Sequence, residues 1–162
     1  MSLVQPKAQD HVGPKASPKT LPQLDRKLSP QIRARQQKAV RFLQTGLKDL
    51  SRKDYAAAEA KIQKAVELDK ENVLAWRMLA FTLDHRQDYA KAFDAYETAA
   101  RLAPNDITLL RDVGLMAYRL DRVALAEKLF VTYLTQNSDD EEVLTSLACV
   151  WRDQNRYGDA VD

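Results

Sequence analysis

The residues that could act as nucleophiles, bases or metal ligands are few and scattered along this sequence. It contains two histidines, His11 and His85, and a single cysteine, Cys149. The repeat pattern described below keeps Cys149 away from both histidines, so the three cannot form the nucleophile, base and orienting group of a covalent mechanism. We therefore expect a protein that is not an enzyme.

One acidic run, from Asp139 to Glu142, is the only candidate for a metal site. It lacks the alternating ligands and the central glycine of a calcium loop, and acidic residues at the start of a helix are favoured by the helix dipole. The sequence also has no glycine-rich loop of the kind that holds phosphate. We expect no metal and no cofactor.

The composition indicates a globular protein. The chain has 162 residues, of which 45% are hydrophobic and 30% are charged, and this balance suits one domain of ordinary size. No apolar run approaches the roughly 20 residues that cross a bilayer, and one cysteine cannot form an internal disulfide. We expect a cytoplasmic protein without membrane insertion.

The N-terminal segment differs from the rest of the chain. Residues 1–38 carry eight Lys and Arg against two Asp, and five of the six prolines lie within residues 1–30. Such a segment buries too little apolar surface to offset its ordering entropy, so we expect residues 1–28 to be flexible. Leu21, Leu24 and Leu28 are spaced to share a helical face and form a short docking element, or they have no role. Without aromatic residues for stacking, this segment is not expected to bind nucleic acid.

An ordered domain is expected over residues 29–162. Serine is a good N-cap and proline is tolerated at the first helical position, so Ser29 and Pro30 predict a helix start. Nothing in the sequence breaks this helix before about Arg52.

The chain repeats itself every 34 residues. Each unit has two amphipathic stretches joined by a short polar turn, which predicts an antiparallel helix pair. Small residues recur where the two helices would cross, because a larger side chain there would push the backbones apart. Two small columns and one mainly aromatic column align at this offset: Gly46, Ala80, Gly114 and Ala148; Ala58, Ala92, Ala126 and Ala160; and Tyr55, Tyr89, Val123 and Tyr157.

These columns resemble the tetratricopeptide repeat, or TPR. The second unit matches best, with Trp76, Leu79, Ala80, Tyr89, Ala92, Tyr96, Ala99 and Pro104 in the family's order. Three positions depart from the pattern: Lys70 replaces the proline of the first unit, and Val123 and Tyr133 alter the third. The resemblance implies an all-α, right-handed superhelical solenoid with repeats 39–72, 73–106 and 107–140 and a partial repeat 141–162. Because the final apolar face lacks a polar cap, we expect either that another chain covers it or, in preference, that the sequence is a fragment of a longer protein.

The resemblance implies a protein-binding role as adaptor or chaperone, because the first helices of TPR units line a concave groove for a peptide. The groove should be apolar at its N-terminal end and cationic further along, which favours a ligand with an apolar segment and acidic groups. The residues expected to face the partner are Val40, Leu43, Leu47, Leu50, Leu74, Arg77, Phe81, His85, Arg111, Leu115, Tyr118 and Arg119.

Several alternatives stay open at this point. In one alternative, the apolar stripe from Val40 to Leu50 belongs to the core, is covered by the N-terminal segment, or is buried between two chains of a homodimer. In another, Arg77, Arg111 and Arg119 are ordinary solvated residues. The clamp that grips a terminal carboxylate in chaperone-binding TPR proteins is not expected, since only Arg111 fits among Leu43, Leu47, Met78, Arg111 and Leu115. Alternative functions are a type III secretion chaperone, which is similar in architecture and length, and a non-catalytic docking domain of a larger enzyme.

Overall fold

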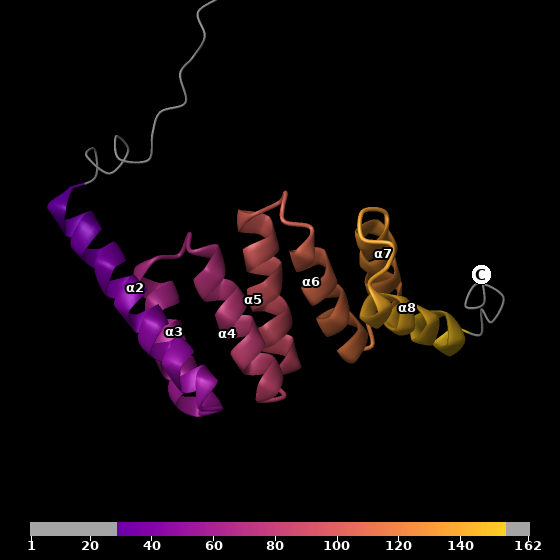
Figure 1. Ribbon diagram of the computed structural model, residues 1–162, viewed down its shortest axis with the longest axis horizontal. Helices are drawn as coiled ribbons and strands as arrows, with labels where there is room; N and C mark the ends of the chain where they lie inside the picture. The colour runs from indigo at the N-terminus through magenta and orange to yellow at the C-terminus, as the bar shows by residue number, and fades with distance from the viewer. Residues whose placement is uncertain (1–28, 155–162) are drawn as a thin grey trace, which may run out of the picture.

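Seven α-helices and no strand make up the described part of the chain, residues 29–154 of the computed structural model. The expectations for residues 1–28, and those for Tyr157 and Ala160, lie outside the described residues. The helices are α2 (Pro30–Ser51), α3 (Tyr55–Leu68), α4 (Val73–His85), α5 (Tyr89–Leu102), α6 (Thr108–Arg119), α7 (Val123–Leu134) and α8 (Glu141–Asp153) (Figure 1).

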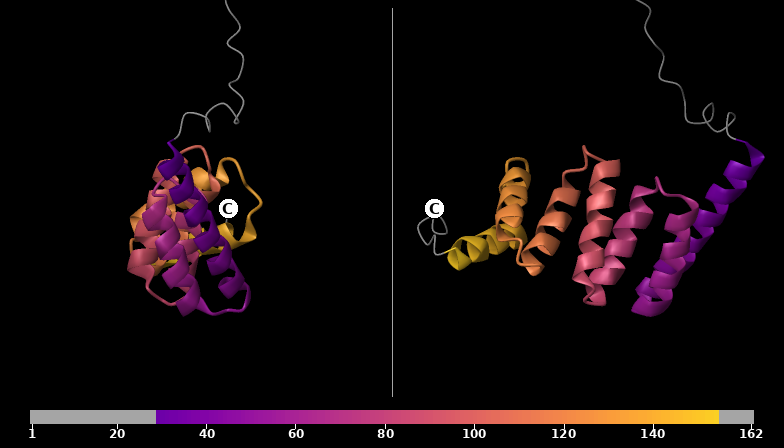
Figure 2. Two further views of the ribbon diagram at one scale, coloured as in Figure 1. Left: turned by 90° about the vertical axis from the view of Figure 1, so that its left-hand side faces the viewer. Right: turned by 180° about the vertical axis from the view of Figure 1, so that it is seen from behind.

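The helices form antiparallel pairs that stack in chain order. Helix α2 packs on α3, α4 on α5 and α6 on α7, while α3 contacts α4, α5 contacts α6 and α7 contacts α8. The two views of Figure 2 show the resulting row of helices from its end and from behind. The predicted all-α solenoid of helix pairs is therefore confirmed.

Polar side chains cap most of the helices at their N-termini. The predicted cap is present in α2, where Ser29 Oγ accepts a hydrogen bond from the Ile32 amide at 3.3 Å and Pro30 is the first helical residue. Aspartate or asparagine does the same before α3, α4, α5 and α8. These caps satisfy amide groups that have no partner within the helix, so local sequence sets where each helix begins.

The turn within each pair contains one residue in the left-handed region. Lys53, Gln87 and Asp121 have φ angles of 60°, 64° and 59°, and they are spaced 34 residues apart in the sequence. None is glycine, although glycine adopts this conformation without steric cost. The 34-residue repeat thus extends to the backbone conformation of the turns.

The glycine column allows the two helices of a pair to approach closely. A Cβ at Gly46 would lie 2.5 Å from Ile62 Cγ1 and 3.4 Å from the Ala58 carbonyl oxygen, and one at Gly114 would lie 2.6 Å from Phe130 Cε1. Ala58, from the other column of small residues predicted at the helix crossing, is fully buried. The mechanical reason for the small columns is therefore confirmed in the first pair.

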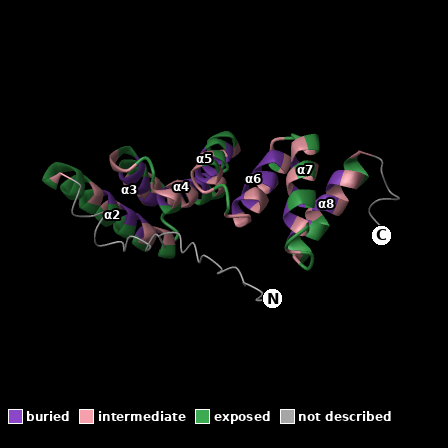
Figure 3. Ribbon diagram, turned by 90° about the horizontal axis from the view of Figure 1, so that it is seen from above, coloured by how far each residue is buried: buried purple, intermediate pink, exposed green. Residues whose placement is uncertain are grey.

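The hydrophobic core runs continuously between the stacked pairs. Buried residues face neighbouring helices, and exposed residues cover the outer surfaces (Figure 3). The departure at Lys70 does not lengthen the helix, since α3 ends at Leu68, and the Lys70 carbonyl accepts a hydrogen bond from Trp76 Nε1 at 2.8 Å. Tyr133 is buried, and its hydroxyl donates to the Asp140 carboxylate at 2.9 Å. The larger side chain is thus accommodated with a polar partner.

Within residues 29–154, every helix is too short or too polar to span a bilayer.

Candidate functional site

Ion pairs join the first helices of the second and third repeats. Arg77 Nη2 on α4 lies 2.9 Å from Asp112 Oδ2 on α6, and Arg119 on α6 pairs with Asp84 on α4. The guanidinium of Arg119 also lies 5.4 Å from the centre of the Tyr89 ring, a distance at which a cation is attracted to an aromatic face. Both arginines were predicted to face a partner, and both are engaged by carboxylates of this chain.

The contacts between α6 and α8, the next pair of first helices, are also polar. Arg111 pairs with Glu142, and Arg111 Nε lies 3.3 Å from Asp140 Oδ2. The Tyr118 hydroxyl donates a hydrogen bond to Asp153 Oδ2 at 3.0 Å. Partial burial, together with the Asp153 carboxylate, raises the pKa of Tyr118. Arg111 and Tyr118, two further polar residues of the predicted set, therefore also have partners within the chain.

The residues of the predicted set on α2 and α4, the first helices of the first two repeats, are mainly apolar instead. Four residues of the predicted set make up what we call the apolar strip: Leu47 and Leu50 on α2, and Leu74 and Phe81 on α4. Leu74 is 51% exposed and Phe81 is 38% exposed, whereas Leu47 and Leu50 are half-buried against the core. Leu and Phe side chains are more often buried than exposed in folded proteins. The exposed Leu74 and Phe81 therefore offer apolar surface that a ligand could cover.

An aromatic cluster borders the apolar strip at the end of α4. The His85 ring stacks on Tyr55 with centroids 4.7 Å apart and planes at 11°. The Phe81 ring meets His85 edge to face, with centroids 4.4 Å apart. Such stacked and T-shaped contacts are favourable geometries for aromatic rings. His85, also predicted to face a partner, therefore packs between the Tyr55 and Phe81 rings.

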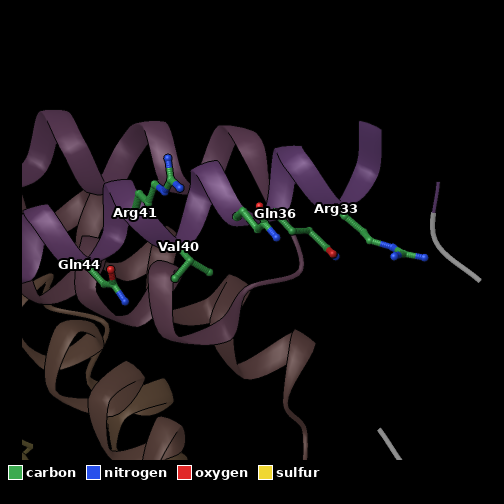
Figure 4. A pocket seen from close by; sticks show the side chains of 6 residues that line it. Arg33, Gln36, Val40, Arg41 and Gln44 are labelled. Carbon is green, nitrogen blue, oxygen red and sulfur yellow. The ribbon is translucent and has the colours of Figure 1, made fainter. Parts of the chain in front are cut away.

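The remaining predicted residues have different surroundings. Val40 on α2 is 44% exposed. Leu115 on α6 is half-buried against the core, and Leu43 is only 6% exposed and belongs to the core itself. Val40 also lines a hollow along α2 with Arg33, Gln36, Gln37, Arg41 and Gln44 (Figure 4).

Sequence reasoning missed the carboxylates that pair with the arginines. Asp112 is buried; this burial raises the pKa of its carboxyl, and the Arg77 guanidinium opposes the rise. Asp84 and Arg119 are 35 residues apart, as are Tyr118 and Asp153. Arg77 and Asp112 are also 35 residues apart, so one repeat plus one residue is the spacing of three of these contacts between consecutive first helices. A search for opposite charges at that spacing would have found Asp84 and Asp112.

The chemistry-bearing residues are far apart in the fold. His85 ends α4, and Cys149 lies on α8, two first helices further along. No group of three potential metal ligands occurs among residues 29–154. Asp140, from the acidic run, instead caps α8 by accepting from the Val143 amide at 3.2 Å.

Two sequence models of one family match the chain. Both are described as tetratricopeptide repeat, and they match residues 43–107 and 79–146. Together they cover the C-terminal part of α2, helices α3 to α7 and the start of α8.

Two curated proteins match over part of their length. Protein FlbA of Caulobacter vibrioides is 36% identical over 109 residues, which is 67% of this chain and 18% of FlbA. The TPR repeat-containing protein MJ1428 of Methanocaldococcus jannaschii is 28% identical over 98 residues, which is 60% of this chain and 17% of that protein. The chain thus spans less than a fifth of the length of these relatives.

Solved structures with the same fold include three with little sequence similarity. The first TPR of Spaghetti (RPAP3), bound to the HSP90 peptide SRMEEVD, has a TM-score of 0.69 at 18% identity and covers 74% of this chain and 95% of that one. YrrB, described as a TPR protein with an unusual peptide-binding site, has a TM-score of 0.69 at 20% identity, covering 80% and 67%. MamA has a TM-score of 0.72 at 17% identity, covering 80% of both chains.

Proposed function

This chain belongs to the tetratricopeptide repeat family, and we propose that it binds an apolar segment of a partner protein across α2 and α4. Members of this family and fold are generally non-catalytic modules for protein interaction. The observation that carries the proposal is the apolar strip, where Leu74 and Phe81 are exposed on a first helix.

The shape of Phe81 and its neighbours supports an apolar contact. Its ring is fixed by His85, which is in turn stacked on Tyr55, so little side-chain entropy is lost when a ligand covers it. Rigid aromatic side chains of this kind often dominate the energy of an interface. Two apolar side chains of the partner segment would remove Phe81 and Leu74, which lie about two helical turns apart, from water, at about 25 cal/mol per Å² of apolar surface.

We expect acidic groups on the ligand to contribute less to binding affinity than its apolar segment does. Arg77, Arg111 and Arg119 were expected to receive them, but each arginine is already paired with a carboxylate of the chain. A ligand carboxylate would have to displace one of these pairs, so the gain is the difference between two similar interactions.

Two structural neighbours give general support for peptide binding. One is bound to an HSP90 peptide, and another is described by its unusual peptide-binding site. Recognition of a terminal carboxylate is not proposed, because Leu43, Leu47, Met78 and Leu115 occupy the clamp positions and Arg111 is paired with Glu142.

The lengths of the curated relatives favour a second, compatible proposal. FlbA and MJ1428 each contain a matching region that is less than a fifth of the protein. We propose that this solenoid serves as a docking part when it occurs within a longer protein. A role as type III secretion chaperone stays a prediction from architecture and length.

Selection from a phage-displayed random peptide library would test the main proposal. We expect the selected peptides to share apolar residues and to lose at least about tenfold in affinity for a Leu74→Ser, Phe81→Ser variant. The matched control is Val131→Ser, Leu144→Ser, which removes two side chains that are 45% and 43% exposed elsewhere. Equal binding to both variants, or no selected peptide at all, would exclude the apolar strip as the binding surface.

A further inference from the structure

A hollow of about 260 Å³ is formed by side chains from three successive helices, α3, α4 and α5. Helix α4 contacts both of the others (Figure 1). Trp76 and Leu83 of α4 line the hollow, and each is two residues away from Leu74 or Phe81 of the apolar strip. Two residues turn an α-helix by about 200°, so the hollow and the apolar strip lie on opposite sides of α4.

The floor of the hollow is apolar. Leu79, Leu83 and Ala95 are 3–4% exposed, whereas Trp76 is half-buried. The Trp76 indole is held in place, because its Nε1 donates a hydrogen bond to the Lys70 carbonyl oxygen at 2.8 Å. A ligand that covers this ring therefore loses little side-chain entropy, and such aromatic residues often dominate the energy of an interface.

Ala95 is the residue that leaves the hollow open. The 34-residue repeat places Lys61 at the equivalent position of the first repeat and Leu129 at that of the third. Leu129 packs half-buried against the core, so the fold accepts a larger side chain at this position. An Ala95→Leu substitution should therefore fill the hollow without preventing folding.

The charged groups of the lining favour a cation. Lys91 is already balanced, because its Nζ lies 2.6 Å from Asp88 Oδ2. Asp94 is exposed, and within residues 29–154 its carboxylate has no hydrogen-bond or ion-pair partner. This carboxylate is therefore available to a lysine or arginine of a ligand. The exposed Gln63 amide can both donate to and accept from a peptide backbone.

We propose that a short segment of a partner protein docks here, with an apolar side chain in the hollow against Trp76 and an adjacent lysine or arginine at Asp94. The hollow is smaller than the roughly 300–1,000 Å³ of sites for small molecules, but it is large enough for one aliphatic side chain. Asp94 disfavours an anionic partner such as a nucleic acid or an anionic membrane. This segment differs from the ligand expected in the groove, for which acidic groups were predicted.

Trp76 provides the readout for a test by NMR. The chain has two tryptophans, so the full-length labelled protein gives two indole N–H signals. Trp151, whose Nε1 donates to Glu127 Oε1 at 3.0 Å, is the internal control, and a Trp151→Phe variant assigns the two signals.

The probe is the peptide acetyl-Ala-Leu-Lys-Ala-amide, and matched peptides replace its leucine with serine or its lysine with glutamate. We expect the probe to shift the Trp76 signal saturably and to leave the Trp151 signal in place. Each matched peptide should bind at least about threefold more weakly, because it lacks either the apolar contact or the ion pair.

Two variants locate the ligand. Ala95→Leu should abolish the shift of the Trp76 signal, whereas Ala124→Leu, at an exposed position of α7, should leave it unchanged. Asp94→Asn should remove the preference for the lysine peptide over the glutamate peptide. Its control is Asp139→Asn, at another exposed position, which should keep that preference.

The hollow and the apolar strip are tested separately. The Leu74→Ser, Phe81→Ser variant should titrate like wild type, because those side chains lie on the other side of α4. Loss of the Trp76 shift in that variant would assign the binding to the apolar strip and overturn the present proposal.

Two further results with peptide would overturn it. One is the absence of a saturable shift of the Trp76 signal in the wild-type chain. The other is equal affinity of wild type and Asp94→Asn for the lysine peptide over the glutamate peptide, which needs no substitution in the core. Equal titration of wild type and a folded Ala95→Leu variant would exclude the hollow in the same way.

Two results without peptide would identify a different occupant. A concentration-dependent shift of the Trp76 signal that Ala95→Leu abolishes would make a second copy of the chain the occupant. A shift of that signal in a full-length Leu21→Ser, Leu24→Ser, Leu28→Ser variant would make the N-terminal segment the occupant. Either result would overturn the proposal of a separate partner.

Discussion

Arg77 on α4 and Asp112 on α6 are joined by an ion pair in which Nη2 lies 2.9 Å from Oδ2. The two residues belong to successive repeats, and Asp112 is only 9% exposed. Burial raises the pKa of the Asp112 carboxyl and the guanidinium counteracts it. The charged form of Asp112 is therefore stabilised mainly by a side chain from the neighbouring repeat, with a smaller contribution from Arg111, whose Nη1 lies 3.7 Å from Asp112 Oδ1.

Replacing Arg77 with glutamine should destabilise the solenoid. The buried Asp112 carboxylate would keep only its longer ion pair with Arg111, whose Nη1 lies 3.7 Å from Asp112 Oδ1. We expect the free energy of unfolding in urea at neutral pH to fall by about 2 kcal/mol. Arg101→Gln on α5, an exposed position, should change it by less than about 0.5 kcal/mol. Equal unfolding midpoints for the two variants would show that the pair adds nothing.

The pH dependence of stability in the Arg77→Gln variant is a second test of the Arg77–Asp112 ion pair. Because the pKa of Asp112 is raised on folding, the folded state binds more protons between the unfolded pKa and the folded one, and stability falls as pH rises through that window. Loss of Arg77 should raise the folded pKa further. The difference from wild type should therefore be largest at neutral pH and shrink in acid; a difference that grows in acid would contradict this cause.

Gly114→Ala sets two effects of opposite sign against each other. Alanine favours a helix over glycine by about 1 kcal/mol, but the new Cβ would lie 2.6 Å from the buried Phe130 ring. Overpacking in a core typically costs about 1–3 kcal/mol, so we expect a net loss of about 1 kcal/mol in chemical denaturation. A more stable variant would show that α6 and α7 can separate at little cost.

Gln87→Gly should stabilise the protein. Gln87 has a φ of 64°, which strains a residue with a side chain, whereas glycine adopts it freely. The gain in the folded state should exceed the extra entropy of the unfolded chain, so we expect about 0.5–1 kcal/mol of added stability by thermal unfolding. The same change at Gln63, inside α3, should instead cost about 1 kcal/mol.

Tyr96→Phe should reduce the loss of stability in alkali. Burial raises the pKa of Tyr96 above its ordinary value of 10.0, and the charges of Asp112 and Asp84 add to the rise. Above that value the unfolded tyrosine ionises while the folded one keeps its proton, so stability falls as pH increases. Comparing unfolding free energies near pH 9 and pH 11, we expect a smaller drop for the variant; equal drops would assign the effect to Tyr118 and Tyr133, whose pKa values are also raised.

The fold was predictable because it depends on residues that recur at one spacing. Gly46 and Gly114 mark close crossings whatever surrounds them, and Ser29 and Pro30 act on the backbone within one turn of helix. The surface chemistry was less predictable. Aligning the chain on itself compares equivalent positions, 34 residues apart, and so never compares Arg119 with Asp84, which lie 35 apart.

Helix periodicity also does not distinguish a residue that faces the groove from a core residue next to the groove. Leu43 and Leu47 are one helical turn apart on α2, yet Leu43 belongs to the core and Leu47 is half-buried. The difference arises from packing against other helices, which a pattern on one helix does not contain. The arginines were predicted as free cations for a related reason, since counting charges along α6 gives no information on the carboxylates of α4 and α8.

The 35-residue register gives each junction between repeats its own chemical identity. At one such register the sequence has Leu50 and His85 at the first junction. The second junction has the Asp84–Arg119 ion pair and the third has the Tyr118–Asp153 hydrogen bond. The repeats share a backbone plan but cannot be exchanged: deleting residues 73–106 would place Leu50 against Arg119 and leave that guanidinium without its carboxylate. The order of the repeats is thus specified by side chains that the repeat pattern itself does not include, so shuffled versions of this solenoid should assemble less stably than the natural order.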